Sequence, residues 1–116
     1  MKYSLFIGRW QPWHDGHQWL IDQELNKGNN VCLAIRDVEV DENNPWTAKR
    51  IQMRLGHIHY DLINQGRLTT IIIPDIQSVN YGRGVGYEVN EHVPPQEVSD
   101  ISATKIREQL RKDGKL

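Results

Sequence analysis

Apolar residues fall into short continuous runs along this chain, and stretches with helical spacing separate the runs. Three runs are expected to be buried strands, namely Tyr3–Ile7, Val31–Ile35 and Leu68–Ile73, and the third is rich in β-branched residues. The run Val31–Ile35 is too continuous in apolar character for an antiparallel sheet with one solvated face, so a parallel sheet is expected. A short fourth or fifth strand is predicted over Tyr87–Val93, where Pro94-Pro95 ends it.

Helical spacing predicts three helices. The first is expected from Gly16 to Leu25, with Gly28 as its C-cap glycine. The second is expected to follow a cap at Thr47 and to run to about Asn64. The third is expected over Lys105–Lys112, capped by Ser102 or Thr104. The expected buried faces are Trp19, Leu20 and Leu25 on the first helix, and Ile51, Leu55, Ile58 and Leu62 on the second.

Strands that alternate with helices predict an α/β domain. We expect three layers, with a mostly parallel sheet of four or five strands, right-handed crossovers and helices on both faces. A chain of 116 residues is long enough for one hydrophobic core and too short for two, so residues 1–116 are expected to form a single domain.

The polar stretch between the first strand and the first helix is a candidate anion site. His14 and His17 lie three residues apart and can both donate hydrogen bonds to one phosphate. Unpaired backbone N–H groups and the helix dipole stabilise an anion at the same place. Gly16 leaves room for close approach, and Arg9 adds a permanent cation. A metal site is the alternative, but the two histidines would need a third ligand.

Composition narrows the choice of partners and compartment. The formal net charge of -1 gives no general basic field, which disfavours nucleic acid as the main partner. Cys32, the one cysteine, lies in an apolar run and is expected to be a small core residue in a reducing compartment. No secretory leader is evident, and no apolar run approaches the roughly 20 residues that span a bilayer. We therefore expect a cytoplasmic protein without membrane contact.

Four segments of the chain resemble one family. Residues 8–17, GRWQPWHDGH, resemble the H-x-G-H signature of the nucleotidyltransferase superfamily, in the G-R-F-Q-P-x-H-x-G-H form of archaeal-type nicotinamide mononucleotide adenylyltransferases. Residues 101–107 are similar to the I-S-x-T-x-x-R motif, residues 43–50 to N-P-F-T-A-x-x-R, and residues 72–76 to I-P-D-I. The resemblance covers nearly the whole chain.

The resemblance implies a Rossmann-like domain of the HUP type and a nucleotidyltransferase. Such an enzyme transfers a nucleoside monophosphate, here with AMP favoured, from a nucleoside triphosphate to a small phosphate-bearing acceptor, for example nicotinamide mononucleotide. His14, His17 and Arg107 would be the catalytic residues. The implied nucleotide-binding residues are Gly8, Arg9, Trp10, Gly16, Ile101, Ser102 and Thr104. Mg²⁺ would bridge the triphosphate oxygens mostly through water, without a dedicated protein metal site.

Acceptor recognition is where the chain departs from the family. After I-P-D-I comes a glycine-rich stretch, Ser78–Glu88, and loops of this length are often functional. Tyr81 and Arg83 from this stretch are candidate acceptor contacts, together with Asp75 and Arg50. One carboxylate of the acidic stretch 36–45 is a further candidate for the acceptor or for magnesium, the alternative being a solvated loop.

Other functions stay open at this point. A cytidylyltransferase that uses CTP and a small phosphate or phosphonate, such as glycerol phosphate, is the nearest alternative. A non-catalytic nucleotide-binding regulatory module is an alternative of another class. A fragment of a class I aminoacyl-tRNA synthetase is disfavoured by the size and the charge of the chain. Because a small open sheet often completes its burial by dimerising, a homo-oligomer is expected. His57 and His59 are expected at the surface.

Overall fold

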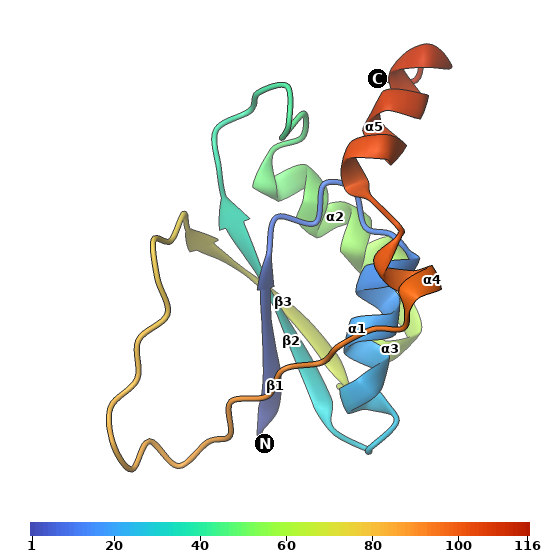
Figure 1. Ribbon diagram of the computed structural model, residues 1–116. Helices are drawn as coiled ribbons and strands as arrows, with labels where there is room; N and C mark the ends of the chain where they lie inside the picture. The colour runs from blue at the N-terminus through green and yellow to red at the C-terminus, as the bar shows by residue number, and fades with distance from the viewer.

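The computed structural model describes residues 1–116 and shows a parallel β-sheet flanked by helices (Figure 1). The sheet has three strands in the order β1-β2-β3, which are β1 (Tyr3–Gly8), β2 (Asn30–Asp37) and β3 (Leu68–Pro74). Both neighbouring pairs are parallel, with Phe6 beside Leu33 and Ile35 beside Ile72. The predicted α/β class with a parallel sheet is confirmed.

The helices are α1 (Asp15–Leu25), α2 (Ala48–Ile58), α3 (Tyr60–Asn64), α4 (Gln96–Ser99) and α5 (Ala103–Lys112). Thr47 caps α2 as predicted, since its Oγ1 accepts a hydrogen bond from the backbone N–H of Arg50 (3.2 Å). Ser102, rather than Thr104, caps α5 by accepting from the backbone N–H of Lys105 (3.4 Å). None of these helices is long and apolar enough to traverse a lipid bilayer.

The single helix predicted from Thr47 to Asn64 is wrong. His59 leaves helical geometry (φ -109°, ψ 26°) and divides the segment into α2 and α3. Its side chain is 4% exposed and packs edge-on against the ring of Trp13, with ring centroids 5.0 Å apart. The prediction that His59 lies at the surface is therefore also wrong, whereas His57 is exposed as predicted.

The core lies between the sheet and the helices α1 and α2. Its buried apolar members are Phe6, Trp10, Ile21, Leu25, Val31, Leu33, Ile35, Ala48, Ile51, Leu55 and Leu68. Two predicted core residues lie elsewhere. Trp19 is only partly buried, because it is two residues from the fully buried Ile21 and so points from the opposite side of α1. Ile58 is 42% exposed, because the break at His59 ends the buried stripe of α2.

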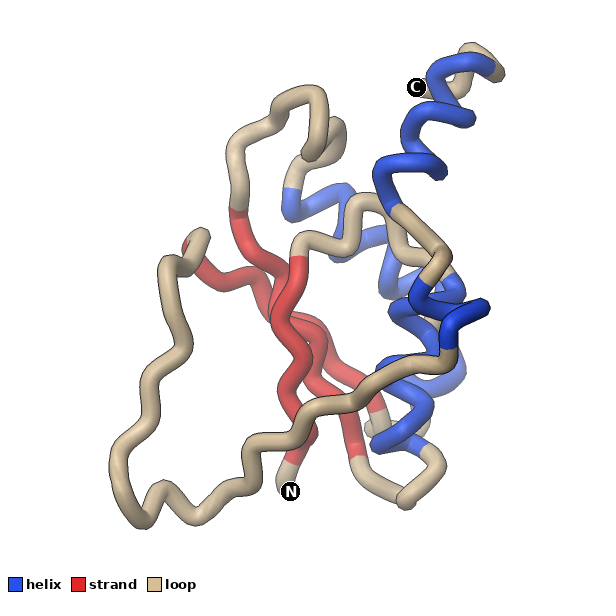
Figure 2. Tube along the Cα trace, viewed as in Figure 1, coloured by secondary structure: helices blue, strands red, loops and turns tan.

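The strand count of four or five is wrong, and the sheet has one helical layer. Between β3 and α4 the chain forms a long loop without helix or strand, so the predicted strand Tyr87–Val93 is absent (Figure 2). Gly82, Gly84 and Gly86 lie just before the predicted strand, and ordering them costs backbone entropy. Tyr87 and Val89 are 60% and 69% exposed there, so no apolar burial offsets that cost.

The strand order explains why helices cover only one face. The chain moves from β1 to β2 to β3 in one direction, and right-handed crossovers then place both connecting helices on the same side of the sheet (Figure 1). A second layer would need the chain to return and add a strand beside β1. The opposite face is left open, with Leu5 57% and Ile71 44% exposed.

Removing a core side chain at the helix–sheet interface should destabilise the domain. Leu55 of α2 is fully buried, and Leu55→Ala should lower the free energy of unfolding by about 2–5 kcal/mol through lost burial and a residual cavity. Met53, on the same helix, is 67% exposed, so Met53→Ala should change it by less than about 0.5 kcal/mol. Urea unfolding measures both, and equal effects would contradict the packing described.

Candidate functional site

The turn after β1 is built around the indole of Trp10. Trp10 has a positive φ of 55°, is 5% exposed, and donates from Nε1 to the carbonyl oxygen of Ala34 (3.2 Å). A Cβ on Gly8 would lie 2.9 Å from the Trp10 ring, so only glycine lets the indole fold back beneath the strand end. Gly8 and Trp10, predicted to bind nucleotide, thus shape the turn and the core.

His14 and His17 form a reciprocal cap at the start of α1. His14 Nδ1 accepts from the backbone N–H of Gly16 (3.0 Å), and His17 Nδ1 accepts from the backbone N–H of His14 (3.2 Å). The two rings stack with centroids 3.7 Å apart. A Cβ on Gly16 would lie 2.8 Å from His14 Cε1, so this glycine is needed for the stack itself.

The capping bonds fix which nitrogen carries the proton. Because both Nδ1 atoms accept hydrogen bonds, each neutral imidazole carries its proton on Nε2 and can donate it to an anion. Burial, and then the neighbouring imidazole of His14, lowers the pKa of His17 to about 3. Burial also lowers the pKa of His14, although Asp15 opposes this effect. Both histidines are therefore neutral hydrogen-bond donors at neutral pH.

Helix α5 meets the same turn from the other end of the chain. Arg107 is 4% exposed, and it donates from Nη1 to the carbonyl oxygen of Gln11 (2.6 Å) and from Nη2 to Thr104 Oγ1 (3.3 Å). His17 packs on the other side chains of this turn, with its ring centroid 4.9 Å from that of Trp10 and 5.2 Å from that of Trp13. The residues predicted to bind phosphate, His17 near one end of the chain and Arg107 near the other, therefore both contact the 10–13 turn.

Gln11 joins a third segment to this turn, and the sequence did not single it out. Its side-chain amide donates to the carbonyl oxygen of Trp46 (2.7 Å) and accepts from the backbone N–H of Trp46 (3.1 Å). Gln11 is 3% exposed, so this pairing satisfies a buried amide. The glutamine within G-R-x-Q-P was the available signal for this role.

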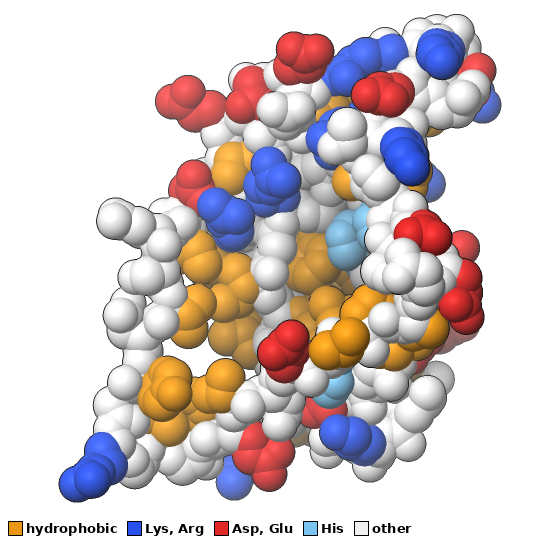
Figure 3. Space-filling model, viewed as in Figure 1, with side chains coloured by type: hydrophobic (Ala, Val, Ile, Leu, Met, Phe, Trp, Pro, Cys, Tyr) orange, Lys and Arg blue, Asp and Glu red, His pale blue; other side chains and the backbone are white.

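A cavity of about 530 Å³ lies beyond the carboxyl ends of the strands. The residues that line this strand-end cavity are Arg9, Arg36, Asp37, Val38, Glu39, Asp41, Asn44 and Asp75. Arg9 donates to Asn44 Oδ1 (3.1 Å), and Arg36 donates twice to Asp75 Oδ1 (3.0 and 2.7 Å). Figure 3 shows cationic and acidic side chains side by side beyond the strand ends. Parallel sheets bind ligands at this edge.

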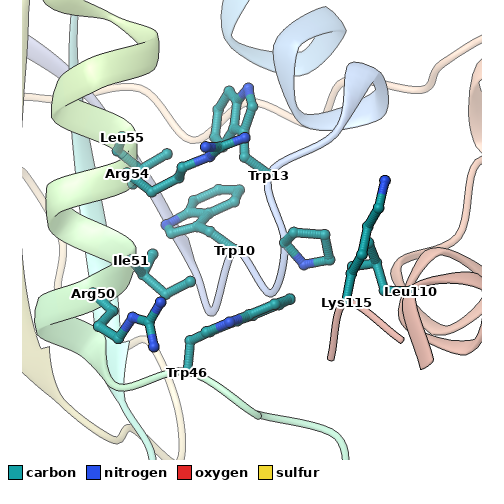
Figure 4. Close-up of a pocket in the computed structure, with 10 residues that line it drawn as sticks. Trp10, Trp13, Trp46, Arg50, Ile51, Arg54, Leu55, Leu110 and Lys115 are labelled. Atoms are coloured by element: carbon teal, nitrogen blue, oxygen red, sulfur yellow. The ribbon is translucent and has the colours of Figure 1, made fainter. Parts of the chain in front are cut away.

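A second cavity of about 280 Å³ opens between the 10–13 turn, α2 and α5 (Figure 4). The residues that line this tryptophan pocket are Trp10, Pro12, Trp13, Trp46, Arg50, Ile51, Arg54, Leu55, Leu110 and Lys115. In this chain Arg50 follows Ala48 by two residues, whereas the family motif has its arginine three residues after the alanine. The motif's position is occupied by Ile51, which is buried in the core, and Arg50 is exposed at the pocket.

The four predicted acceptor contacts do not gather in one place. Asp75 lines the strand-end cavity, where it pairs with Arg36, and Arg50 lines the tryptophan pocket. Tyr81, 65% exposed, and Arg83 stand on the long loop and line neither cavity. The remaining nucleotide candidates stay near α5 or α1: Ile101 and Ser102 precede α5, and Gly16 opens α1.

The side chains do not form a protein metal cage. No group of three or more His, Cys, Asp or Glu residues is placed to hold an ion. Asp41 Oδ1 already accepts from the side chain and backbone of Asn44 and the backbone of Asn43, and these bonds lower the pKa of Asp41. Asp37 and Glu39 complete the acidic lining of the strand-end cavity. These few carboxylates suit a magnesium ion whose other ligands are phosphate oxygens and water.

Sequence comparison finds archaeal relatives. The chain is 26% identical to a nicotinamide-nucleotide adenylyltransferase of Caldivirga maquilingensis, over 98% of this chain and 64% of that protein. It is 30% identical to the protein of the same name from Pyrobaculum neutrophilum, over 84% of this chain and 55% of that protein. No family model and no solved structure matches the chain. The resemblance read from the motifs is confirmed, and the chain spans less than two thirds of the length of these relatives.

Acid should destabilise the fold through His17. Its pKa is about 3 in the folded protein and 6.5 ordinarily, so the unfolded chain binds more protons between these values. The free energy of unfolding should therefore fall as the pH drops from about 6.5 toward 3, by at most about 1.4 kcal/mol per pH unit for one group. His17→Gln, which can still cap, should show a smaller loss between pH 7 and pH 5 in urea unfolding. The exposed control His57→Gln should keep the wild-type loss, and a wild-type loss in His17→Gln would refute the assignment.

Proposed function

This chain is a relative of the archaeal-type nicotinamide-nucleotide adenylyltransferases, and we propose that it is itself a nucleotidyltransferase. It transfers AMP from ATP to a small phosphate-bearing acceptor and releases pyrophosphate. One observation carries the proposal: His17 and Arg107 pack on the same 10–13 turn, although they come from opposite ends of the chain. Phosphate-binding groups from α1 and α5 can therefore act on one triphosphate.

The proposed reaction is an in-line displacement without a covalent enzyme intermediate. A phosphate oxygen of the acceptor forms a bond to the α-phosphorus of ATP. The bond from that phosphorus to the oxygen of the β-phosphate breaks, and the electron pair leaves with pyrophosphate. The protein's contribution is to position the two substrates and to stabilise the charge that moves toward the leaving group.

The side chains divide this work by charge. His14 and His17 donate from Nε2 to oxygens at the α-phosphate, and as neutral groups they need not lose or gain a proton. Arg107 and the backbone at the start of α5 hold the β- and γ-phosphates, and Thr104 supports Arg107. Arg9, in the strand-end cavity, contributes a further cation. If Mg²⁺ is bound with the triphosphate, it would supply neutralisation of part of the phosphate charge.

Nicotinamide mononucleotide is the proposed acceptor. The relatives are named nicotinamide-nucleotide adenylyltransferases, which supports this choice, and the G-R-x-Q-P segment supports ATP as the donor. Asp75, Tyr81 and Arg83 stay proposed acceptor contacts, whereas Arg50, which lines the separate tryptophan pocket, is not kept among them. Tyr81 and Arg83 stand on a loop that lacks regular structure, so it can adjust to a ligand.

His17→Ala should lower kcat/KM for pyrophosphate release by on the order of 100- to 1000-fold, about 2.7–4 kcal/mol, as expected for one lost electrostatic donor. Circular dichroism checks that the variant stays folded. The matched control is His57→Ala, because His57 is exposed on α2 and lines neither cavity. A folded His17→Ala enzyme with wild-type turnover would remove His17 from the mechanism.

A substrate panel tests the reaction class and the acceptor together. Each of ATP, CTP, GTP and UTP is offered with nicotinamide mononucleotide or with glycerol 3-phosphate, and pyrophosphate release is measured. We expect release with ATP and nicotinamide mononucleotide. Release with CTP and glycerol 3-phosphate would identify a cytidylyltransferase instead. Nucleotide binding with no release for any pair would indicate a regulatory module.

A further inference from the structure

The tryptophan pocket is separate from the strand-end cavity, and none of the proposed catalytic residues His14, His17 and Arg107 lines it. The two cavities share no lining residue. The strand-end cavity is bounded by carboxylates and arginines, whereas the tryptophan pocket combines apolar walls with cations. A ligand of the tryptophan pocket therefore needs an apolar part as well as a negative charge.

The cations of the pocket have no partner in the protein. Arg50, Arg54 and Lys115 line the pocket, and no carboxylate does. The side chains of these three residues make no hydrogen bond or ion pair, whereas Arg9, Arg36 and Arg107 all have partners. Arginine and lysine in this arrangement favour a phosphate or another compact anion.

The walls of the pocket favour a planar ring. Trp46 is only partly buried and stacks on no other aromatic ring, whereas Trp10 and Trp13 pack on each other and on His17. Figure 4 shows the indole of Trp46 across the pocket from Trp10. Pro12 also lines the pocket. Nucleobases stack on exposed indole faces, and the identity of the base matters little. A ring can thus lie on Trp46 while its phosphate reaches the cations.

We propose that the tryptophan pocket binds a nucleoside monophosphate, with the base on Trp46 and the phosphate between Arg50, Arg54 and Lys115. The volume of about 280 Å³ is at the lower end for ligand pockets and suits one mononucleotide rather than a dinucleotide. The occupant contacts α2 through Arg54, α5 through Leu110, and the segment after α5 through Lys115. It therefore fastens α5, the helix that carries Arg107, to the body of the domain.

Isothermal titration calorimetry with AMP and CMP tests the site, with adenosine and ribose 5-phosphate as half-ligand controls. Each monophosphate should bind at least about ten-fold more tightly than either half, since ring and phosphate both contribute. Trp46→Ala and the exposed Arg54→Gln should each weaken this binding about ten-fold or more. Lys49→Gln, an adjacent charge that does not line the pocket, should leave it unchanged.

His17→Ala distinguishes this site from the proposed donor site. AMP binding at the tryptophan pocket should survive in His17→Ala and should slow hydrogen exchange in α5. Binding that disappears in His17→Ala and persists in Trp46→Ala would overturn the proposal, as would equal affinity for AMP and ribose 5-phosphate. Pyrophosphate release is measured in a separate assay, so a failure of the proposed enzymatic reaction stays distinguishable from a failure of this site.

Discussion

Gln11 holds together the parts of the molecule from which the site is made. Its side chain fixes the backbone of Trp46 ahead of α2, and its carbonyl oxygen receives Arg107 from α5. Leaving one such buried polar group unpaired costs about 1–3 kcal/mol, so the three segments hold one another in place. The sheet supplies only the strand end from which the turn starts. The relative positions of α2 and α5 depend on this turn.

The sequence predicts the part of the fold that local patterns determine. The strands β1, β2 and β3 follow from continuous apolar runs, and Thr47 and Ser102 cap their helices as their side chains allow. The errors come from long-range effects. The apolar alternation around Tyr87 fits a strand, but a strand forms only where a partner edge and a buried face offset the entropy of ordering glycines. The sequence predicts His59 at the surface, because local spacing does not show that Trp13 packs against it.

The candidate site is also predicted only in part, because local patterns identify some of its residues and long-range packing determines the others. The spacing of His14 and His17 places both rings on the first turn of α1, and a motif match identifies Arg107. The role of Gly16 differs from the expected one, since the glycine makes room for the His14 ring rather than only for a ligand. Gln11, Trp13 and Trp46 gain their roles only from tertiary packing, which spacing does not encode.

The tautomers fixed at the start of α1 decide where acid–base control of the proposed reaction resides. Two imidazoles that stay uncharged through the physiological range cannot act as a protonation switch. A phosphate monoester, in contrast, takes up its second proton near pH 6 and then becomes a poorer nucleophile. The fall of the reaction rate at low pH would thus come from protonation of the attacking acceptor phosphate. An acceptor whose phosphate has a lower pKa would keep reacting at lower pH.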